Sequence, residues 1–326
     1  APVPIEQYVR GVRAQRLQTG WLNKESLAKA LGGMVLTPQL ISQVGPAVNS
    51  GNSFLLYGRP GNGKTYLAES LFMLESSPIF LPYALECQGV IIKLYDPVYH
   101  QLLEKAEDSY TSVSFEPRYD GRWAYCRRPT ITTGGELSLD MLDLKMNPVS
   151  KTYDAPFQLK ANNGVYLIDD FGRQKASPAE VLNRWIVPMD RRVDFLTFQT
   201  GGKVEIPFEC FLIFSTNLKP EQLGDEAFLR RLQYKMLVRN PDEFEYAEIF
   251  RRFCVKCNLA CDQGLLDRFI DKHYRKTGRP MRRCQPRDVL SHAVDLIHFE
   301  RRPMELTDEV LDQAFESCFV DTSEEA

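Results

Sequence analysis

The run GRPGNGKT, residues 58–65, constrains the fold of this chain more than any other stretch. An apolar strand is predicted just before it at 53–57, and a helix is predicted to begin at about Lys64. Glycine reaches backbone conformations that other residues avoid, so several N–H groups of such a loop can turn inward as an anion nest. The helix that follows directs its positive amino end at the same point. The pattern therefore predicts a phosphate-binding loop, in which Lys64 reaches the outer phosphates and the Thr65 hydroxyl ligates Mg²⁺.

An acidic pair follows a second apolar strand, in VYLIDD at residues 165–170. Neighbouring residues of a strand point to opposite faces, so two adjacent acids make sense where the strand leaves its sheet. In open parallel sheets that carboxyl edge is where ligands bind. We predict that Asp169 holds Mg²⁺ and that Asp170 orients or deprotonates the attacking water. A solvated strand end is the alternative interpretation.

Polar and basic residues follow at three further places. Asn217 stands after the apolar run FLIF, where its amide can reach a terminal phosphate or the water; an ordinary turn residue is the alternative. Arg230 and Arg231 are adjacent in DEAFLRRLQYK. A guanidinium can spread charge over a transferring phosphoryl group, although such pairs are usually solvated. Arg287, in CQPRDVL, stands at a predicted helix start, where a cation opposes the helix dipole unless a phosphate lies nearby. A surface arginine is the alternative there.

The order of predicted elements indicates an α/β fold. Strands alternate with helices up to about residue 240, which predicts a parallel sheet, and a helical pattern after it predicts a separate smaller domain. We divide the chain into an N-terminal helical linker segment at 1–42, a nucleotide-binding core at 43–240 and a helical lid at 241–326. The core is expected to carry an insertion at about 97–160 and a hairpin at 194–208, turning at Gly201–Gly202.

Bulk properties narrow the class of protein. The net charge of −3 argues against a surface built wholly for nucleic acid. No apolar run is long enough to span a bilayer, and the amino terminus lacks the layout of a signal peptide. The eight cysteines are scattered, and we interpret them as reduced thiols. A cytoplasmic protein is therefore expected, and an upstream domain absent from this sequence stays open.

In this order and spacing, the elements resemble the AAA+ ATPase superfamily over about residues 35–300. GRPGNGKT is similar to its Walker A motif, VYLIDD to its Walker B motif and Asn217 to its sensor 1. Arg230 and Arg231 resemble its arginine fingers, and Arg287 resembles its sensor 2. The hairpin before Phe211 resembles the MoxR-like branch, which has a pre-sensor-1 hairpin, whereas DEAFLRRLQYKMLVRNPDE looks more like the meiotic clade.

The resemblance implies a three-layer αβα P-loop NTPase core with a C-terminal helical lid, and ATP and Mg²⁺ as cofactors. It also implies a homo-oligomeric ring, most often a hexamer, in which the arginines act on the nucleotide of the neighbouring subunit. Catalytic roles are implied for Asp170, Asn217, Arg230 and Arg231, and metal binding for Thr65 and Asp169. The positions implied to bind nucleotide are Gly58, Pro60, Gly61, Asn62, Gly63, Lys64, Thr65, Tyr66 and Arg287.

Three functions fit these motifs. The leading one is a ring-forming ATPase that acts as a motor or chaperone-like remodeller of a protein partner. The second is a slow-turnover, nucleotide-dependent assembly switch, suggested because Asp170 stands where the family usually has Glu. The third is a nucleic-acid-linked machine, for which the arginines between Arg279 and Arg283 leave some room. The insertion contains the aromatic and glycine-rich run RWAYCRRPTITTGGELSLDML, which would either face a ring pore or form a surface insertion, the latter favoured by loop statistics.

Overall fold

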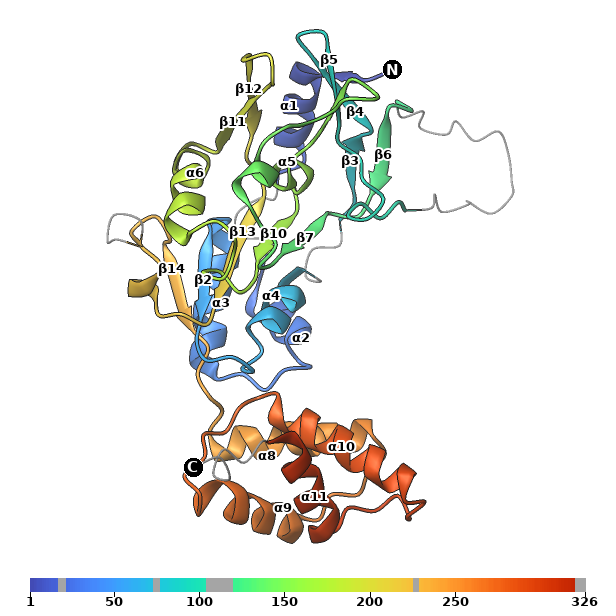
Figure 1. Cartoon of the computed structure of the whole chain (residues 1–326), viewed down its shortest axis with the longest axis vertical. Helices are drawn as coiled ribbons and strands as arrows, with labels where there is room; N and C mark the ends of the chain where they lie inside the picture. The colour runs from blue at the N-terminus through green and yellow to red at the C-terminus, as the bar shows by residue number, and fades with distance from the viewer. Residues whose placement is uncertain (17–21, 73–76, 104–119, 225–228, 320–326) are drawn as a thin grey trace, which may run out of the picture.

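The computed structural model describes residues 1–16, 22–72, 77–103, 120–224 and 229–319. Figure 1 shows three regions along the long axis of the molecule: a β-rich region at one end, a central parallel sheet with its helices, and a helical region at the other end. The chain is therefore a mixed α/β protein with a C-terminal helical region, as the order of predicted elements indicated.

The central sheet has five strands, all parallel. Their order across the sheet is β14 (Tyr234–Leu237), β2 (Phe54–Tyr57), β13 (Phe211–Thr216), β10 (Val165–Ile168) and β7 (Thr130–Thr133). The strands are short, and most of their residues are buried, as expected for parallel strands covered on both faces. Because all five run in one direction, the residues that follow β2, β10 and β13 meet at the same carboxyl edge.

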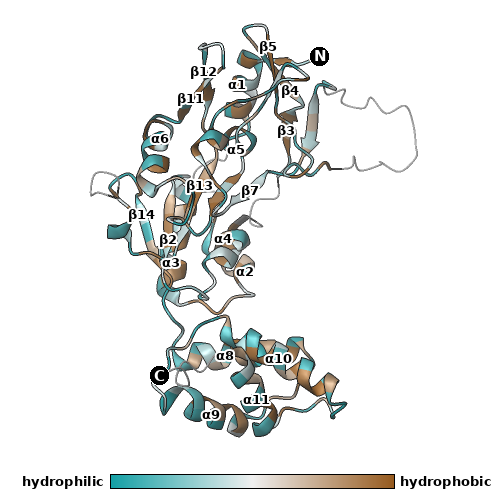
Figure 2. Ribbon diagram, viewed as in Figure 1, coloured by the Kyte–Doolittle hydropathy of each residue, from teal (hydrophilic) through white to brown (hydrophobic). Residues whose placement is uncertain are grey.

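Helices cover both faces of this sheet. They are α2 (Lys24–Ala30), α3 (Pro38–Ser50), α4 (Lys64–Phe72) and α6 (Pro178–Arg191). Phe54 and Leu56 of β2 pack toward α2, α3 and α4, whereas Leu55 packs toward α6, where Trp185 is buried. This alternation follows from the two-residue period of a strand. The core thus has three layers, and Figure 2 shows hydrophobic residues along β2 and β13 inside it.

A β-rich region adjoins the central sheet (Figure 1). Its larger sheet has the order β1 (Val3–Pro4), β4 (Ala84–Cys87), β5 (Val90–Lys93), β9 (Thr152–Asp154) and β8 (Lys145–Asn147). Two antiparallel pairs accompany it, β3 (Ile79–Pro82) with β6 (Trp123–Cys126) and β11 (Val193–Thr197) with β12 (Lys203–Pro207). Helix α1 (Ile5–Ala14) and the short α5 (Phe157–Lys160) bury side chains in the same hydrophobic cluster.

The arrangement differs from two expected domain boundaries. Residues 1–42 were expected to form a linker, but Tyr8 of α1 is fully buried in the β-rich region, and α2 packs on the central sheet. The expected insertion at 97–160 contains β7, an edge strand of the central sheet. Residues 104–119 of that insertion lie outside the described residues. The partners of α1 come from strands much later in the chain, which local periodicity cannot reveal.

The C-terminal region has its own hydrophobic core, to which Phe250, Phe269 and Phe315 contribute. Its helices are α8 (Glu243–Lys256), α9 (Gln263–Ile270), a π-helical turn (Asp271–Arg275), α10 (Gln285–Phe299) and α11 (Asp308–Cys318). We refer to this region as the lid. Across the described ranges, no helix combines the length and the apolar character that crossing a membrane requires.

Candidate functional site

The loop between β2 and α4 has the backbone that its glycines predict. Gly58 and Gly61 have φ angles of 146° and 78°, and Gly63 is also in the left-handed half of the φ range. A Cβ atom placed on Gly58 would lie 2.4 Å from the carbonyl oxygen of Val238, which follows β14. Gly58 therefore has two reasons to lack a side chain, its conformation and the close approach of the neighbouring strand.

Lys64 lies inside this loop and is buried. Its ammonium Nζ donates to the carbonyl oxygens of Gly58 (3.0 Å) and Arg59 (3.2 Å) and to Oδ1 of Asn217 (2.7 Å). Burial lowers the pKa of Lys64, and the nearby carboxylates of Asp169 and Asp170 oppose part of that shift. The ammonium is thus held by weak neutral acceptors in a site where an anion would be a better partner.

Thr65 and Asp169 come together at the carboxyl edge of the sheet. The Thr65 hydroxyl Oγ1 donates to Oδ2 of Asp169 at 2.8 Å, although the two residues belong to different strand–loop units. A hydroxyl and a carboxylate are hard oxygen donors of the kind that Mg²⁺ takes in company with phosphate oxygens. The two residues therefore fit a magnesium ion bound to a nucleotide.

Asp170 and Asn217 form the second contact of this edge. Nδ2 of Asn217 donates to Oδ1 of Asp170 at 2.7 Å, while Oδ1 of the same amide accepts from Lys64. Asp170 is exposed and has a φ angle of 48°, a left-handed conformation that few residues other than glycine adopt. Asn217 thus connects Lys64 to the candidate catalytic acid through the two ends of one amide.

The remaining loop positions face different surroundings. Asn62 is fully buried, and its Nδ2 donates to Oδ1 of Asn240 at 2.8 Å. Tyr66, at the start of α4, is more than half exposed, and its hydroxyl oxygen would lie 3.4 Å from a Cβ atom on Gly33. The side chain of Asn62 therefore reaches toward the lid, and the side chain of Tyr66 reaches toward the turn at 32–33.

Lid residues that sequence analysis did not assign to the site lie against the loop. The N–H of Cys284 donates to the carbonyl oxygen of Gly61 at 2.9 Å, and Arg282 Nη1 donates to that of Pro60 at 3.2 Å. Sequence analysis had noted this arginine run only as a possible basic patch. Arg279 instead stacks its guanidinium on Phe319, 4.6 Å from the ring centre. Arg279 and Arg282 of this run therefore contact other groups of the same chain.

Arg287 lies at a helix start, as its sequence context predicts. It lies exposed in the first turn of α10, and both Nε and Nη2 donate to Oδ1 of Asp288 at 2.9 Å. The neighbouring acid offsets the unfavourable cation at this helix end. Among the described residues of the lid, Arg282, Arg283 and Cys284 form hydrogen bonds with the loop at 58–65, whereas Arg287 pairs with Asp288.

A buried ion pair fixes the same part of the lid. Nη2 of Arg283 lies 3.0 Å from both carboxylate oxygens of Glu245, and the two side chains are 8% and 10% exposed. Arg283 Nη1 also donates to the carbonyl oxygen of Val35, in the segment before α3. Arg283 therefore joins helix α8 and the turn before α10 to the segment that precedes α3.

We expect Arg283→Ala to destabilise the lid by about 3–5 kcal/mol, because Glu245 would stay buried without its cation. Denaturant unfolding followed by lid fluorescence or hydrogen exchange measures this change. Arg268→Ala is the matched control, since its two-nitrogen pair with Asp308 is 60% and 55% exposed. Exposed pairs contribute little, so this control should lose far less stability. Equal losses in the two variants would contradict the assigned role of Arg283.

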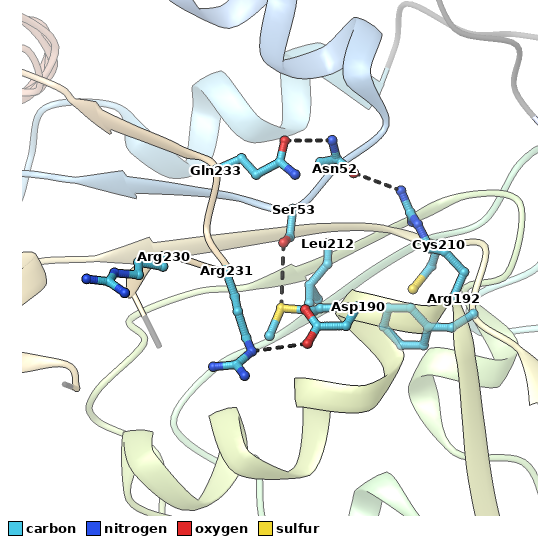
Figure 3. Close-up of a pocket in the computed structure, with 11 residues that line it drawn as sticks. Asn52, Ser53, Asp190, Arg192, Cys210, Leu212, Arg230, Arg231 and Gln233 are labelled. Atoms are coloured by element: carbon cyan, nitrogen blue, oxygen red, sulfur yellow. Dashed lines mark hydrogen bonds and ion pairs between the residues drawn. The ribbon is translucent and has the colours of Figure 1, made fainter. Parts of the chain in front are cut away.

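Arg230 and Arg231 lie at the opposite edge of the central sheet, where the strands begin. They line a cavity of about 670 Å³. The other residues that line it are Asn52, Ser53, Met189, Asp190, Arg192, Phe208, Cys210, Leu212 and Gln233. Arg231 Nε lies 3.2 Å from Oδ2 of Asp190, while Arg230 extends away from the other labelled side chains (Figure 3). This edge is separated from Lys64 by the length of the strands, so the structure does not bring either arginine to the residues of the 58–65 loop of its own chain. The candidate phosphate site is defined by its residues at the carboxyl edge of the sheet. The cavity lies elsewhere, at the edge where the strands begin.

Comparison with known proteins adds information on the fold. Residues 242–317, which make up most of the lid, match a family model described as a domain of unknown function, DUF8689. No curated protein matches the chain in sequence. The chain is similar to the crystal structure of NtrX from Brucella abortus, with a TM-score of 0.51 and 12% sequence identity. The similarity covers 93% of this chain and 60% of the NtrX chain. At this identity the likeness is one of fold, and it supports the P-loop-like α/β architecture described above.

Proposed function

We propose that this chain binds and hydrolyses ATP as a protein of the AAA+ type. One observation carries the proposal: a lysine, a threonine, two aspartates and an asparagine from three loops meet at the carboxyl edge of a parallel sheet. They are Lys64, Thr65, Asp169, Asp170 and Asn217, joined by contacts of 2.7–2.8 Å. A glycine-rich loop and a helix amino terminus at the same point add backbone N–H groups, which favour a polyphosphate.

The geometry suggests a role for each side chain. Incoming phosphate would draw the Lys64 ammonium away from the carbonyl oxygens of Gly58 and Arg59, because a charged acceptor outcompetes neutral ones. The same movement would release Oδ1 of Asn217, whose amide is then available to the terminal phosphate or the attacking water. Asp170 is the acid placed to orient that water and accept its proton. A bound Mg²⁺, held through Thr65 and Asp169, would offset negative charge on the phosphates.

The positions of Arg230 and Arg231 support a site completed by a second copy of the chain. They stand at the edge of the sheet opposite the phosphate loop, so a head-to-tail contact would bring them to the nucleotide of a neighbour. Repetition of such a contact closes into a ring, and we propose a hexamer by resemblance to the family. By resemblance we also propose the MoxR-like branch, whose members have a hairpin at the position that β11 and β12 take before β13. The partner to be remodelled is proposed to be a protein.

Two inactive variants should restore each other if the site is shared between copies. Asp170→Asn lacks the catalytic acid, and a double Arg230→Ala/Arg231→Ala variant lacks the trans cations. In a random equal mixture, about a quarter of the interfaces would combine an intact acid with an intact arginine pair, so about a quarter of wild-type ATP turnover should return. Turnover per chain of the wild type should also rise with protein concentration.

The mixing experiment has a built-in control. Asp170→Asn mixed with Lys64→Ala should stay inactive if both changes damage the same half of the interface. Activity of the arginine double variant alone, at the wild-type level, would exclude a catalytic role for both arginines. Wild-type turnover that does not vary with concentration would point to a site that is complete within one chain.

The slow-turnover switch stays a second candidate because of a specific contact. Asn217 holds Asp170 at 2.7 Å while it also accepts from Lys64, so the acid is engaged before nucleotide arrives. Asp170 is also one methylene shorter than the Glu usual in the family, which places the water differently. In this interpretation ATP binding drives assembly and hydrolysis only resets it.

A further inference from the structure

We propose that Gln174 is a positioning residue that holds the turn after β10 in the shape needed by Asp170. The inference rests on the proposed ATPase function and adds a residue that no motif in the sequence singled out. Gln174 lies four residues beyond Asp170, in a short connection that ends before α6. Within the described residues, its side chain forms no hydrogen bond with the loop at 58–65, and it acts through the backbone that carries the acid.

One side-chain amide makes four contacts with backbone groups of this connection and its neighbour. Oε1 of Gln174 accepts from the N–H of Gly172 at 2.7 Å. Nε2 donates to the carbonyl oxygens of Asp169 (3.0 Å) and Asp170 (3.2 Å), and more weakly to that of Gly134 (3.4 Å). Both the oxygen and the nitrogen of the amide therefore form hydrogen bonds. These contacts extend from the backbone of Asp169 and Asp170 to the loop after β7.

The backbone under Asp170 needs such support. Asp170 and Gly172 have φ angles of 48° and 105°, so the chain enters the left-handed region twice within three residues. A residue with a Cβ atom disfavours that region, and isolated Asp residues prefer extended or right-handed conformations. The N–H of Arg173 donates to the carbonyl oxygen of Asp170 at 3.0 Å and closes the turn, and the N–H of Phe171 donates to that of Ser215 at 2.7 Å. The N–H of the Asp169–Asp170 peptide donates to Oδ1 of Asp169 at 3.0 Å, and its carbonyl oxygen accepts from Gln174.

The position of the catalytic carboxylate follows from this backbone. Asp170 is exposed, and its Oδ1 accepts a hydrogen bond from Nδ2 of Asn217 at 2.7 Å. A short side chain has few ways to compensate a change in its own backbone, so rotation of the peptide would move the carboxylate off Asn217 and off the attacking water. Lys64, which carries the phosphate contacts, belongs to another loop. Loss of Gln174 should therefore reduce catalysis more than nucleotide binding.

The test uses Gln174→Ala and Gln174→Glu in the full chain. Gln174→Glu keeps an acceptor for Gly172 but loses the donors to the three carbonyl groups. Gln15→Ala is the matched control: its amide also bridges backbone groups, donating to Gly11 and Phe80 oxygens at 3.1 and 3.0 Å, but in the β-rich region. The kcat for ATP, the KM for ATP, the affinity for a fluorescent ATP analogue and hydrogen exchange at Gly172 are measured for all four proteins.

We expect both Gln174 variants to lose about 10- to 100-fold in kcat, the loss that a displacement of about 1 Å in a catalytic group produces. KM and analogue affinity should stay within about twofold of the wild type. Hydrogen exchange at Gly172 should be faster in Gln174→Ala, and Gln15→Ala should match the wild type in every readout.

Several results would overturn the inference. Equal losses of kcat and of analogue affinity would mean that Gln174 merely supports the fold, as would a kcat loss of the same size in Gln15→Ala. An unchanged kcat together with faster exchange at Gly172 would mean that Gln174 holds the turn but that the shape of the turn does not affect catalysis. A wild type without ATP turnover would instead refute the proposed function, and exchange at Gly172 would still report whether Gln174 holds the turn.

Discussion

Lys64→Ala is expected to abolish ATP turnover, with a loss of at least about 100-fold, and to remove the stabilisation of the protein by nucleotide. The ammonium lies inside the phosphate loop, within 3.2 Å of two backbone carbonyl oxygens and of Asn217. Alanine would leave these acceptors without a donor and would leave the phosphates without their nearest cation. ATP turnover and the shift of melting temperature on addition of MgATP measure the two effects.

The control for this variant is Lys203→Ala, which removes an exposed lysine from β12. It should keep both turnover and the MgATP-induced shift. Chelation of Mg²⁺ in the wild type should reduce turnover to the level of Lys64→Ala, because Thr65 is neutral and Asp169 is an anion that repels a triphosphate unless a cation lies between them. A Lys64→Ala protein that still gains stability from MgATP would place the nucleotide elsewhere on the chain.

Asp170→Asn is expected to lower ATP turnover by at least about 100-fold while ATP affinity stays near the wild-type value. An amide cannot accept the proton of the attacking water, but it preserves the size of the side chain and a contact with Asn217. Binding depends on Lys64 and on loop N–H groups, which this change leaves in place. Single-turnover hydrolysis and equilibrium binding of a fluorescent ATP analogue separate the two steps.

Asp170→Glu then distinguishes the two candidate functions. For an ATPase whose site is shaped around aspartate, we expect turnover to change by less than about threefold, or to fall. The 2.7 Å contact with Asn217 already fits the shorter side chain, and an added methylene would carry the carboxylate past it. A gain of more than about tenfold would favour the slow-turnover switch, in which the shorter acid restrains hydrolysis.

The glycine loop and the strands beside it are the parts of this protein whose backbone the sequence predicts best. Gly58 and Gly61 have the left-handed backbone expected of a glycine loop, and β2 and β10 have nearly the predicted limits. Thr65 and Asp169 were both predicted to bind Mg²⁺, and their side chains lie 2.8 Å apart because the loops after parallel strands meet at one edge of the sheet. Each of these features depends on residues that are close in sequence or on the shared direction of parallel strands, and both are visible in local patterns.

The sequence was less informative about the surroundings of that site. The burial of Tyr8 requires strands that lie far along the chain from α1. The sequence pattern at 136–146 favours a helix, but the structure has a short 3-10 turn (Leu139–Leu142) followed by β8, because pairing with β9 overrides local helical periodicity. Gln174 carried no motif, since a glutamine in a polar connection gives no periodic or spacing signal.

By itself, the sequence determined the α/β order of elements, the phosphate loop and the acidic strand end, because glycine conformation and strand periodicity are local properties. Tertiary structure alone decided that Arg282 and Cys284 of the lid lie on Pro60 and Gly61, and that Arg230 and Arg231 lie at the opposite edge of the sheet. These relations depend on how separate elements pack, and packing is set by the shapes and charges of side chains that meet only when the chain has folded.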